Sequence, residues 1–167
     1  MITKNLEDAI RILKEDELVA ILTETVYGLA GNAFSESAIS KIFKLKNRPF
    51  FNPLIAHIAS KNDLNKVAKN IPEKAKILAD RFWPGPLTLV LPKQDHIPDI
   101  LTANKQTVAV RVPNHPLTLT LLKQIDFPLA APSANPFSSI SPTTPKHVED
   151  YFKNQLKLIL DGGTCVR

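Results

Sequence analysis

Apolar residues recur along the chain in two patterns, one with the period of an α-helix and one in short continuous runs. Between residues 6 and 13 the apolar positions are spaced i, i+3, i+4 and i+7, which predicts an amphipathic helix capped by Thr3. Residues 18–22, with the sequence LVAIL, form a continuous apolar run of strand length. Because such runs are typical of strands covered on both faces, we expect this strand to be buried within a sheet.

The two patterns continue to alternate along the chain, with prolines at many of the boundaries. Pro72 opens one predicted helix at a position where a proline loses no hydrogen bond, and Pro84 and Pro86 follow its end. Further helices are predicted at 35–46, 62–68, 72–82, 116–123 and 145–152, and further strands at 54–58, 87–91, 107–112, 128–131 and 156–160. Strands interleaved with helices in this way predict an α/β fold whose sheet is largely parallel or mixed.

The length and composition suit one globular domain. The chain has 167 residues, of which 44% are hydrophobic and 22% charged, close to the averages for globular proteins. No apolar run approaches the roughly 18 residues of a membrane-spanning helix, and the N-terminal segment lacks the order of a signal peptide. The single cysteine, Cys165, excludes a disulfide framework and a multi-cysteine zinc site. We therefore expect a soluble, cytoplasmic, single-domain protein.

The net charge of +5 favours anionic ligands, and the window 41–48 carries four cations and no acid. Lys46 and Arg48 stand where the predicted helix must end before Pro49. Cations at a helix C-terminus can simply complement the helix dipole. Alternatively, the planar fork of an arginine and the point charge of a lysine can hold the phosphates of a polyphosphate. This window alone does not decide between the two interpretations.

Polar and turn residues gather after the apolar strands, and ligands of open α/β sheets bind beyond the carboxyl ends of strands. These segments are 23–28, 46–53, 111–115, 133–144 and 161–164, and we expect them to form one shared site. Ser133 and Asn135 lie in one of them, between Pro132 and Pro136. Their side chains can either satisfy the backbone of their own turn or contact a ligand held by that rigid frame.

Several familiar classes of site are excluded by motif. The chain contains no phosphate-binding loop with a Lys-Ser/Thr pair, no dinucleotide GxGxxG motif and no Gly-x-Ser-x-Gly nucleophile elbow. Its four histidines lack the spacing of metal ligands. His57, within the predicted strand LIAHI, is the histidine that could point into a pocket, and a hydrogen-bonded core histidine is the alternative.

A series of motifs resembles one family, the YrdC/TsaC-like threonylcarbamoyl-adenylate synthases that begin threonylcarbamoyladenosine formation on tRNA. The motifs follow the family's order through essentially the whole chain: LTETVYGLAGNA, KLKNRPFFNPL, FWPGPLTLVL, VAVRVPNHP, PLAAPSAN, SPTT and ILDGG. The resemblance implies a twisted mixed sheet flanked by helices around a basic concave pocket. It also implies a nucleotidyltransferase that forms threonylcarbamoyl-AMP and pyrophosphate from L-threonine, bicarbonate or carbon dioxide, and ATP, with Mg²⁺.

The same resemblance implies roles for individual residues. Lys46, Arg48, Ser133 and Asn135 correspond to the family's nucleotide-binding residues, with Lys46 and Arg48 as the catalytic pair that offsets phosphate charge. The family's threonine contacts correspond to Thr25, His57 and Arg111. No magnesium ligand is assigned.

Three departures from the family pattern stand out. Leu22 replaces a proline, and Asn47 replaces a glycine at a position where asparagine tolerates left-handed backbone geometry. The family's G-x-E-S-T segment, which helps close the threonine pocket, does not follow the DGG turn. We therefore expect the single domain over residues 1–167 to lack its C-terminal part and to be a weak or inactive synthase.

Two other functions compete with the synthase. A basic pocket also suits a module that binds double-stranded RNA or tRNA without catalysis, since phosphate contacts need no chemistry. A related protein with another carbamoyl-transfer role, or an inactive one, is the third possibility. Release of pyrophosphate from ATP that depends on both threonine and bicarbonate separates the enzyme from the binding module.

Overall fold

An eight-stranded mixed sheet runs through the computed structural model, which describes residues 1–165. The strand order is β1-β8-β2-β3-β7-β4-β6-β5. Its strands are β1 (Ile2–Thr3), β2 (Val19–Leu22), β3 (Tyr27–Asn32), β4 (Ile55–His57), β5 (Leu89–Pro92), β6 (Thr107–Arg111), β7 (Leu129–Ala130) and β8 (Leu158–Leu160). The pairs β1–β8, β8–β2 and β4–β6 are parallel and the others antiparallel, so the predicted mixed sheet is confirmed.

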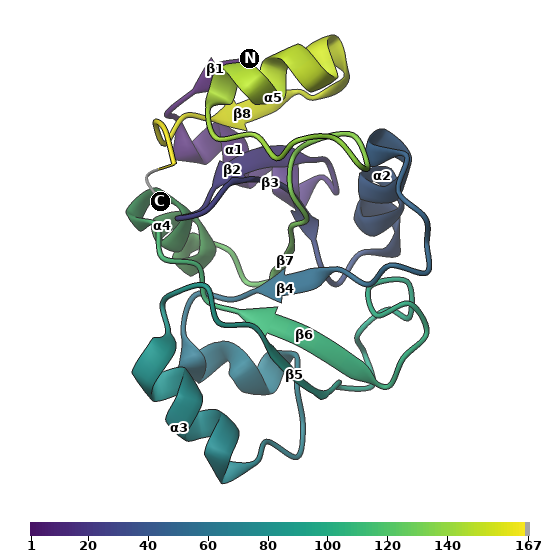
Figure 1. Ribbon diagram of the computed structural model, residues 1–167, viewed down its shortest axis with the longest axis vertical. Coiled ribbons are helices and arrows are strands. Elements are labelled where there is room, and N and C mark those ends of the chain that lie inside the picture. The colour runs from purple at the N-terminus through teal and green to yellow at the C-terminus, as the bar shows by residue number, and fades with distance from the viewer. Residues whose placement is uncertain (166–167) are drawn as a thin grey trace.

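The sheet has two parts that meet at β7. Strands β1, β8, β2 and β3 lie on one side of it, and β4, β6 and β5 lie on the other, as Figure 1 shows above and below the middle of the molecule. Ala130 pairs with Gly31 of one part and Ala56 of the other, and Leu129 pairs with Asn32 and His57. Residues on either side of β7 extend this connection, since the N–H of Ala131 donates to the carbonyl oxygen of Ile55 and that of Leu29 to the carbonyl oxygen of Pro132.

Helices cover both faces of the sheet. They are α1 (Leu6–Lys14), α2 (Glu36–Lys46), α3 (Glu73–Phe82), α4 (Pro116–Gln124) and α5 (Pro145–Phe152), with 3₁₀ helices η1 (Lys61–Lys66) and η2 (Lys153–Gln155). Apolar residues of α1 and α4 pack with Val19 and Ile21 of β2, whereas those of α2 and α5 share a second cluster with Ala20 and Leu22. Strand β2 is therefore buried on both faces, as predicted. Within the described part of the chain, no helix has the length and apolar character needed to cross a membrane.

Four details differ from the sequence predictions. Asn5, not Thr3, caps α1, because its side-chain oxygen accepts hydrogen bonds from the N–H groups of Glu7 and Asp8. The predicted helix at 62–68 is the shorter 3₁₀ helix η1. Strands β1 and β3 were not predicted, because β1 has two residues and β3 contains two glycines, which have low strand propensity.

Candidate functional site

Helix α2 ends at Lys46, and the next residue, Asn47, has a left-handed backbone conformation that turns the chain. Asn47 has φ 54° and ψ 41°, and its N–H donates to the carbonyl oxygen of Lys44 at 3.1 Å. The N–H of Arg48 donates to the carbonyl oxygen of Phe43 at 2.9 Å. These two bonds close the helix in the manner usual for a left-handed cap, where asparagine is the common alternative to glycine. The replacement of the family's glycine by Asn47 therefore preserves the turn.

Lys46, the last residue of α2, is 1% exposed and fastens the helix to the turn at residues 133–137. Its Nζ donates to the carbonyl oxygens of Ser133 and Asn135, both at 2.5 Å, and its own carbonyl oxygen accepts from the N–H of Phe137 at 2.8 Å. Burial, followed by the nearby charge of Arg48, lowers the pKa of Lys46 to about 8. An ammonium group has three N–H donors, so one remains for a ligand.

Arg48 lies beside Lys46 with an unused donor. Its Cζ is 5.7 Å from the centroid of the Phe137 ring, and Nη2 donates to the carbonyl oxygen of Pro53 at 3.2 Å. The Nε atom is buried and has no hydrogen-bond partner within residues 1–165. Because an arginine stays protonated at physiological pH, this unpaired N–H is a charged donor suited to an anion.

The turn that contains Ser133 and Asn135 packs against the start of β3. Ser133 forms an isolated bridge with Gly28, and the N–H of Ala134 donates to the carbonyl oxygen of Tyr27 at 2.8 Å. A Cβ added at Gly28 would lie 3.3 Å from the Cβ of Ala131, so this close approach favours a glycine.

Asn135 is buried, and among the described residues only one of the two polar atoms of its side-chain amide has hydrogen-bond partners. Its Nδ2 donates to the carbonyl oxygens of Pro136 and Ser139, both at 2.9 Å. Its Oδ1 has no partner among the described residues. The side chain therefore both fixes its own turn and retains an acceptor, so the two interpretations of this residue are compatible.

A tight turn between β2 and β3 positions Thr25. The N–H and hydroxyl of Thr23 both donate to the carbonyl oxygen of Val26, at 3.1 and 2.8 Å. The hydroxyl oxygens of Thr23 and Thr25 lie 3.1 Å apart. Since Thr23 is buried and Thr25 is half-buried, the turn presents Thr25 at the surface of the site.

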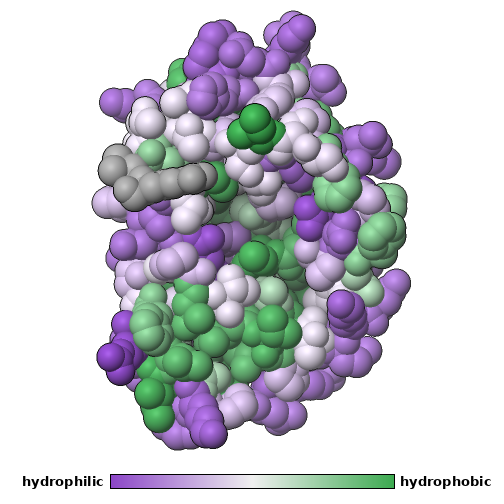
Figure 2. Space-filling model, in the orientation of Figure 1, coloured by the Kyte–Doolittle hydropathy of each residue, from purple (hydrophilic) through white to green (hydrophobic). Residues whose placement is uncertain are grey.

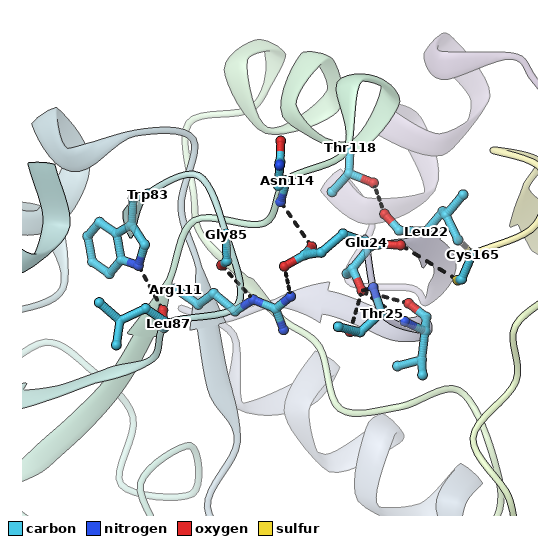
Figure 3. Close-up of polar contacts among 12 residues, drawn as sticks. Leu22, Glu24, Thr25, Trp83, Gly85, Leu87, Arg111, Asn114, Thr118 and Cys165 are labelled. Atoms are coloured by element: carbon cyan, nitrogen blue, oxygen red, sulfur yellow. Dashed lines mark hydrogen bonds and ion pairs between the residues drawn. The ribbon is translucent and has the colours of Figure 1, made fainter. Parts of the chain in front are cut away.

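Glu24, in the same turn, forms an ion pair with Arg111 at the end of β6 (Figure 3). The second carboxylate oxygen of Glu24 accepts from the N–H of Asn114 at 3.0 Å, and Nε of Arg111 donates to the carbonyl oxygen of Gly85 at 3.1 Å. Partial burial acts to raise the pKa of Glu24, but hydrogen bonds from its own N–H, Asn114 and Arg111 outweigh it and lower the pKa. Glu24 is the site residue that sequence reasoning missed.

His57 is a buried histidine directly beside Arg111. The two residues are register partners in the parallel pair β4–β6, and Nδ1 of His57 lies 3.2 Å from the carbonyl oxygen of Ile55. Burial, with the positive charge of Arg111, lowers the pKa of His57 to about 4, so the ring is neutral at neutral pH. With 2% of its surface exposed, His57 occupies the position of a hydrogen-bonded core histidine, and its contact with threonine stays a prediction.

The last described residues pack across the β2–β3 turn. The hydroxyl of Tyr27 donates to the carbonyl oxygen of Gly163 at 2.7 Å and accepts from the N–H of Gly162 at 3.3 Å. The N–H of Cys165 donates to the carbonyl oxygen of Thr143 at 2.9 Å. Contacts therefore link each of the five polar segments to another of the five, whereas their forming one shared ligand site stays a prediction.

The sheet order alone would not bring Glu24 and Arg111 together. Strands β3 and β6 are separated by β7 and β4, which corresponds to roughly 14 Å in a flat sheet with neighbours about 4.8 Å apart. The contact of Glu24 with the backbone of Asn114 therefore reflects the curvature of the sheet and the path of the chain after β6. Figure 2 shows this face of the molecule hollowed between its upper and lower parts.

Comparison with known proteins identifies the family. The model named Sua5/YciO/YrdC, described as "Telomere recombination", matches residues 11–167. The chain belongs to this family. A threonylcarbamoyl-AMP synthase from Pyrococcus abyssi is 52% identical over 151 residues, which are 90% of this chain and 44% of the relative. A threonylcarbamoyl-AMP synthase from Bacillus subtilis is 48% identical over 156 residues, 93% of this chain and 45% of the relative.

A solved structure of a Sua5/YciO/YrdC protein shares the fold. The crystal structure of P. abyssi Sua5 complexed with L-threonine matches with a TM-score of 0.93 and 50% identity over 95% of this chain and 47% of that chain. The chain thus spans less than half the length of these relatives. The family resemblance and the fold that it implied are confirmed.

The site of this family member contains three cations and one acid among the residues described above. Lys46 and Arg48 stand with Ser133 and Asn135 on one side, and Glu24 and Arg111 stand on the other, with Thr25 in the turn that also carries Glu24. No group of three or more His, Cys, Asp or Glu side chains in residues 1–165 could hold a metal ion. Lys46 and Arg48 thus form one cationic position, and Arg111, paired with Glu24, lies apart from it.

Proposed function

We propose that this chain carries out the threonylcarbamoyl-AMP synthase reaction, in which L-threonine, bicarbonate or carbon dioxide, and ATP give threonylcarbamoyl-AMP and pyrophosphate. The observation that carries the proposal is the presence of two separate sets of charged donors, Lys46 with Arg48 and Arg111 held by Glu24, joined by one network of turns. The reaction brings together two anionic substrates, a nucleoside triphosphate and an amino-acid carboxylate. The two relatives from P. abyssi and B. subtilis are threonylcarbamoyl-AMP synthases, which supports the same activity for this chain.

ATP binds on the side of Lys46 and Arg48. The unused N–H of Arg48 and the remaining N–H of Lys46 donate to phosphate oxygens and offset their charge. The free Oδ1 of Asn135 is an acceptor, so it faces a hydroxyl or amino group of the nucleoside, while the hydroxyl of Ser133 can donate to phosphate. Mg²⁺ enters with ATP, held by phosphate oxygens and water, as is usual for this ion.

Threonine binds on the side of Arg111. Two of the five guanidinium N–H groups are used by Gly85 and Glu24, which leaves three for the carboxylate of the amino acid. The hydroxyl of Thr25 lies in the turn that carries Glu24 and can contact the side chain or carbamate of the substrate. His57, the register partner of Arg111 in the neighbouring strand, is neutral and so adds no second positive charge there.

The chemical step needs no covalent intermediate with the protein. The amino group of threonine first takes up carbon dioxide and loses a proton, which gives a carbamate. A carbamate oxygen then attacks the α-phosphorus of ATP, and the bond to the β-phosphate oxygen breaks as pyrophosphate leaves. The protein contributes by positioning both anions and by stabilising charge on the phosphate oxygens.

The product is an activated threonine for tRNA modification, so the proposal includes a cytoplasmic reaction with tRNA or double-stranded RNA as a further partner. The test is to measure pyrophosphate release from ATP with threonine and bicarbonate present together and with each omitted. Release that needs both supports the synthase. Binding of double-stranded RNA without such release would instead support the RNA-binding alternative.

A further inference from the structure

The Glu24–Arg111 pair is unusually well fixed for an ion pair at the rim of a site. The side chains are 20% and 12% exposed, and both carboxylate oxygens of Glu24 have donors, from Arg111 and from the backbone of Asn114. Figure 3 shows the carboxylate between the guanidinium and Asn114, with Gly85 on the other side of Arg111. Because its lone pairs are engaged and its pKa is lowered, Glu24 is not placed to accept a proton during the reaction.

We propose that Glu24 is a positioning residue that sets both the orientation and the net charge of Arg111, and thereby reserves the Arg111 position for a singly charged carboxylate. This inference rests on the proposed function, in which Arg111 binds the carboxylate of threonine. The orientation of the Arg111 guanidinium follows from its hydrogen bonds. Its Nε donates to Gly85 and its Nη2 donates to Glu24, so the directions of its remaining N–H groups are fixed.

The preference of the Arg111 position for a carboxylate over a polyphosphate follows from charge. An isolated arginine attracts a polyphosphate more strongly than a carboxylate, because a polyphosphate carries several negative charges. With Glu24 in contact, the pair has no net charge, so a polyphosphate gains little by occupying the position and meets the repulsion of the carboxylate. The carboxylate of threonine, with one charge and a planar shape, still fits the remaining donors of the fork. The two anionic substrates are thus directed to different ends of the site.

The decisive variants are Glu24→Gln and Glu24→Ala. Glutamine keeps the shape of the side chain and can accept one of the two hydrogen bonds, but it removes the negative charge. Alanine removes both the contact and the charge. The matched control is Glu17→Ala, because Glu17 also pairs with a cation, Lys41 at 2.9 Å, but lies outside the site.

Threonine binding is measured by calorimetry with and without inorganic pyrophosphate. For Glu24→Gln, we expect pyrophosphate to compete with threonine at a concentration about tenfold lower than for the unaltered chain. For Glu24→Ala, we expect threonine affinity to fall by about ten- to hundredfold with ATP affinity little changed.

The double variant Glu24→Ala/Arg111→Ala should bind threonine no worse than Arg111→Ala alone, because Glu24 acts through Arg111. Equal competition in all variants, or additive losses in the double variant, overturns the proposal.

A second readout does not depend on threonine. The ¹⁵N signals of the Arg111 guanidinium, assigned with Arg111→Lys, report rotation about the Nε–Cζ bond. We expect restricted rotation in the unaltered chain and in Glu17→Ala, and faster rotation in Glu24→Ala. If the unaltered chain does not bind threonine but shows this difference, the proposed substrate is wrong while the positioning of Arg111 by Glu24 stands. Equal rotation in all three proteins overturns the positioning role itself.

Discussion

The ammonium nitrogen of Lys46 lies 2.5 Å from the carbonyl oxygen of Asn135, in a position closed to solvent. The lysine therefore has two functions in one side chain. It holds the turn that carries Ser133 and Asn135 against the end of α2, and in the proposed function it also donates its third N–H to ATP. A change at Lys46 should alter folding and nucleotide binding together, whereas a change at Arg48 should alter mainly nucleotide binding.

Lys46→Met should lower the free energy of unfolding by about 1–3 kcal/mol, because the carbonyl oxygens of Ser133 and Asn135 lose their donor inside the protein. Denaturant unfolding measures the difference. Lys44→Met, at an exposed position of the same helix, is the control and should change stability by less than about 0.5 kcal/mol. Equal stability of the two variants would show that the buried contacts of Lys46 contribute nothing net.

ATP binding should take up protons near pH 8. The pKa of Lys46 is about 8 in the free protein, so the amine is about half protonated at that pH. Phosphate oxygens nearby favour the ammonium form and raise this pKa, so a proton binds with ATP and affinity falls as the pH rises through 8. Calorimetry in two buffers with different ionisation enthalpies measures the uptake. At pH 6.5, where Lys46 is protonated with or without ATP, the contribution of Lys46 to the uptake should vanish.

Arg48→Ala should weaken ATP binding by about ten- to hundredfold, which corresponds to the roughly 1.5–3 kcal/mol of a charge-assisted hydrogen bond. Arg48→Lys keeps the charge but lacks the planar fork, so it should recover part of the loss. Calorimetric titration with ATP measures both variants. Unchanged affinity in a folded Arg48→Ala protein would reject the phosphate contact.

Arg111→Ala should weaken threonine binding by at least about tenfold while ATP affinity stays within about threefold, because the two ligands bind at different cations. Separate titrations with threonine and with ATP give the two values. Arg81→Ala is a control on α3, at an exposed arginine outside the site. Equal losses for both ligands in Arg111→Ala would contradict the division of the site.

Tyr27→Phe should release the segment at residues 161–165, since it removes the hydroxyl that joins the carbonyl of Gly163 and the N–H of Gly162. The rate of alkylation of Cys165, the single cysteine of the chain, measures how often the segment opens. A loss of about 1 kcal/mol of local stability would raise that rate by roughly fivefold. Tyr151→Phe, which removes a hydroxyl bonded to the carbonyl of Ile140, should leave the rate unchanged.

Much of the fold follows from local signals in the sequence. The helix predicted at 145–152 is α5 with the same bounds, because Thr144 caps it and Pro145 occupies its first position. Strand β2 was predicted from a continuous apolar run that is buried on both faces. In these elements, capping, periodicity and burial all favour the same structure, so the local sequence is enough to predict them.

Strand β3 could not be predicted, because distant contacts determine it. A Cβ at Gly31 would lie 2.9 Å from Leu18, the residue before β2, and 3.3 Å from Ile42 of α2, so packing requires a glycine at a position where glycine lowers strand propensity. Glu24 was missed for a related reason. Its partner Arg111 is 87 residues away, and one glutamate in a polar turn gives no sign of such a contact.

The strand β7 is only two residues long, which makes the paired connection between the two parts of the sheet narrow. Leu129 and Ala130 carry the ladder between the two parts of the sheet, and the Glu24–Arg111 pair spans the same two parts on the side of the site. Backbone hydrogen bonds from Ala131 to Ile55 and from Leu29 to Pro132 lie beside this ladder, whereas the ion pair lies away from it. The Glu24–Arg111 pair therefore adds a side-chain link to the short backbone connection between the two parts of the sheet.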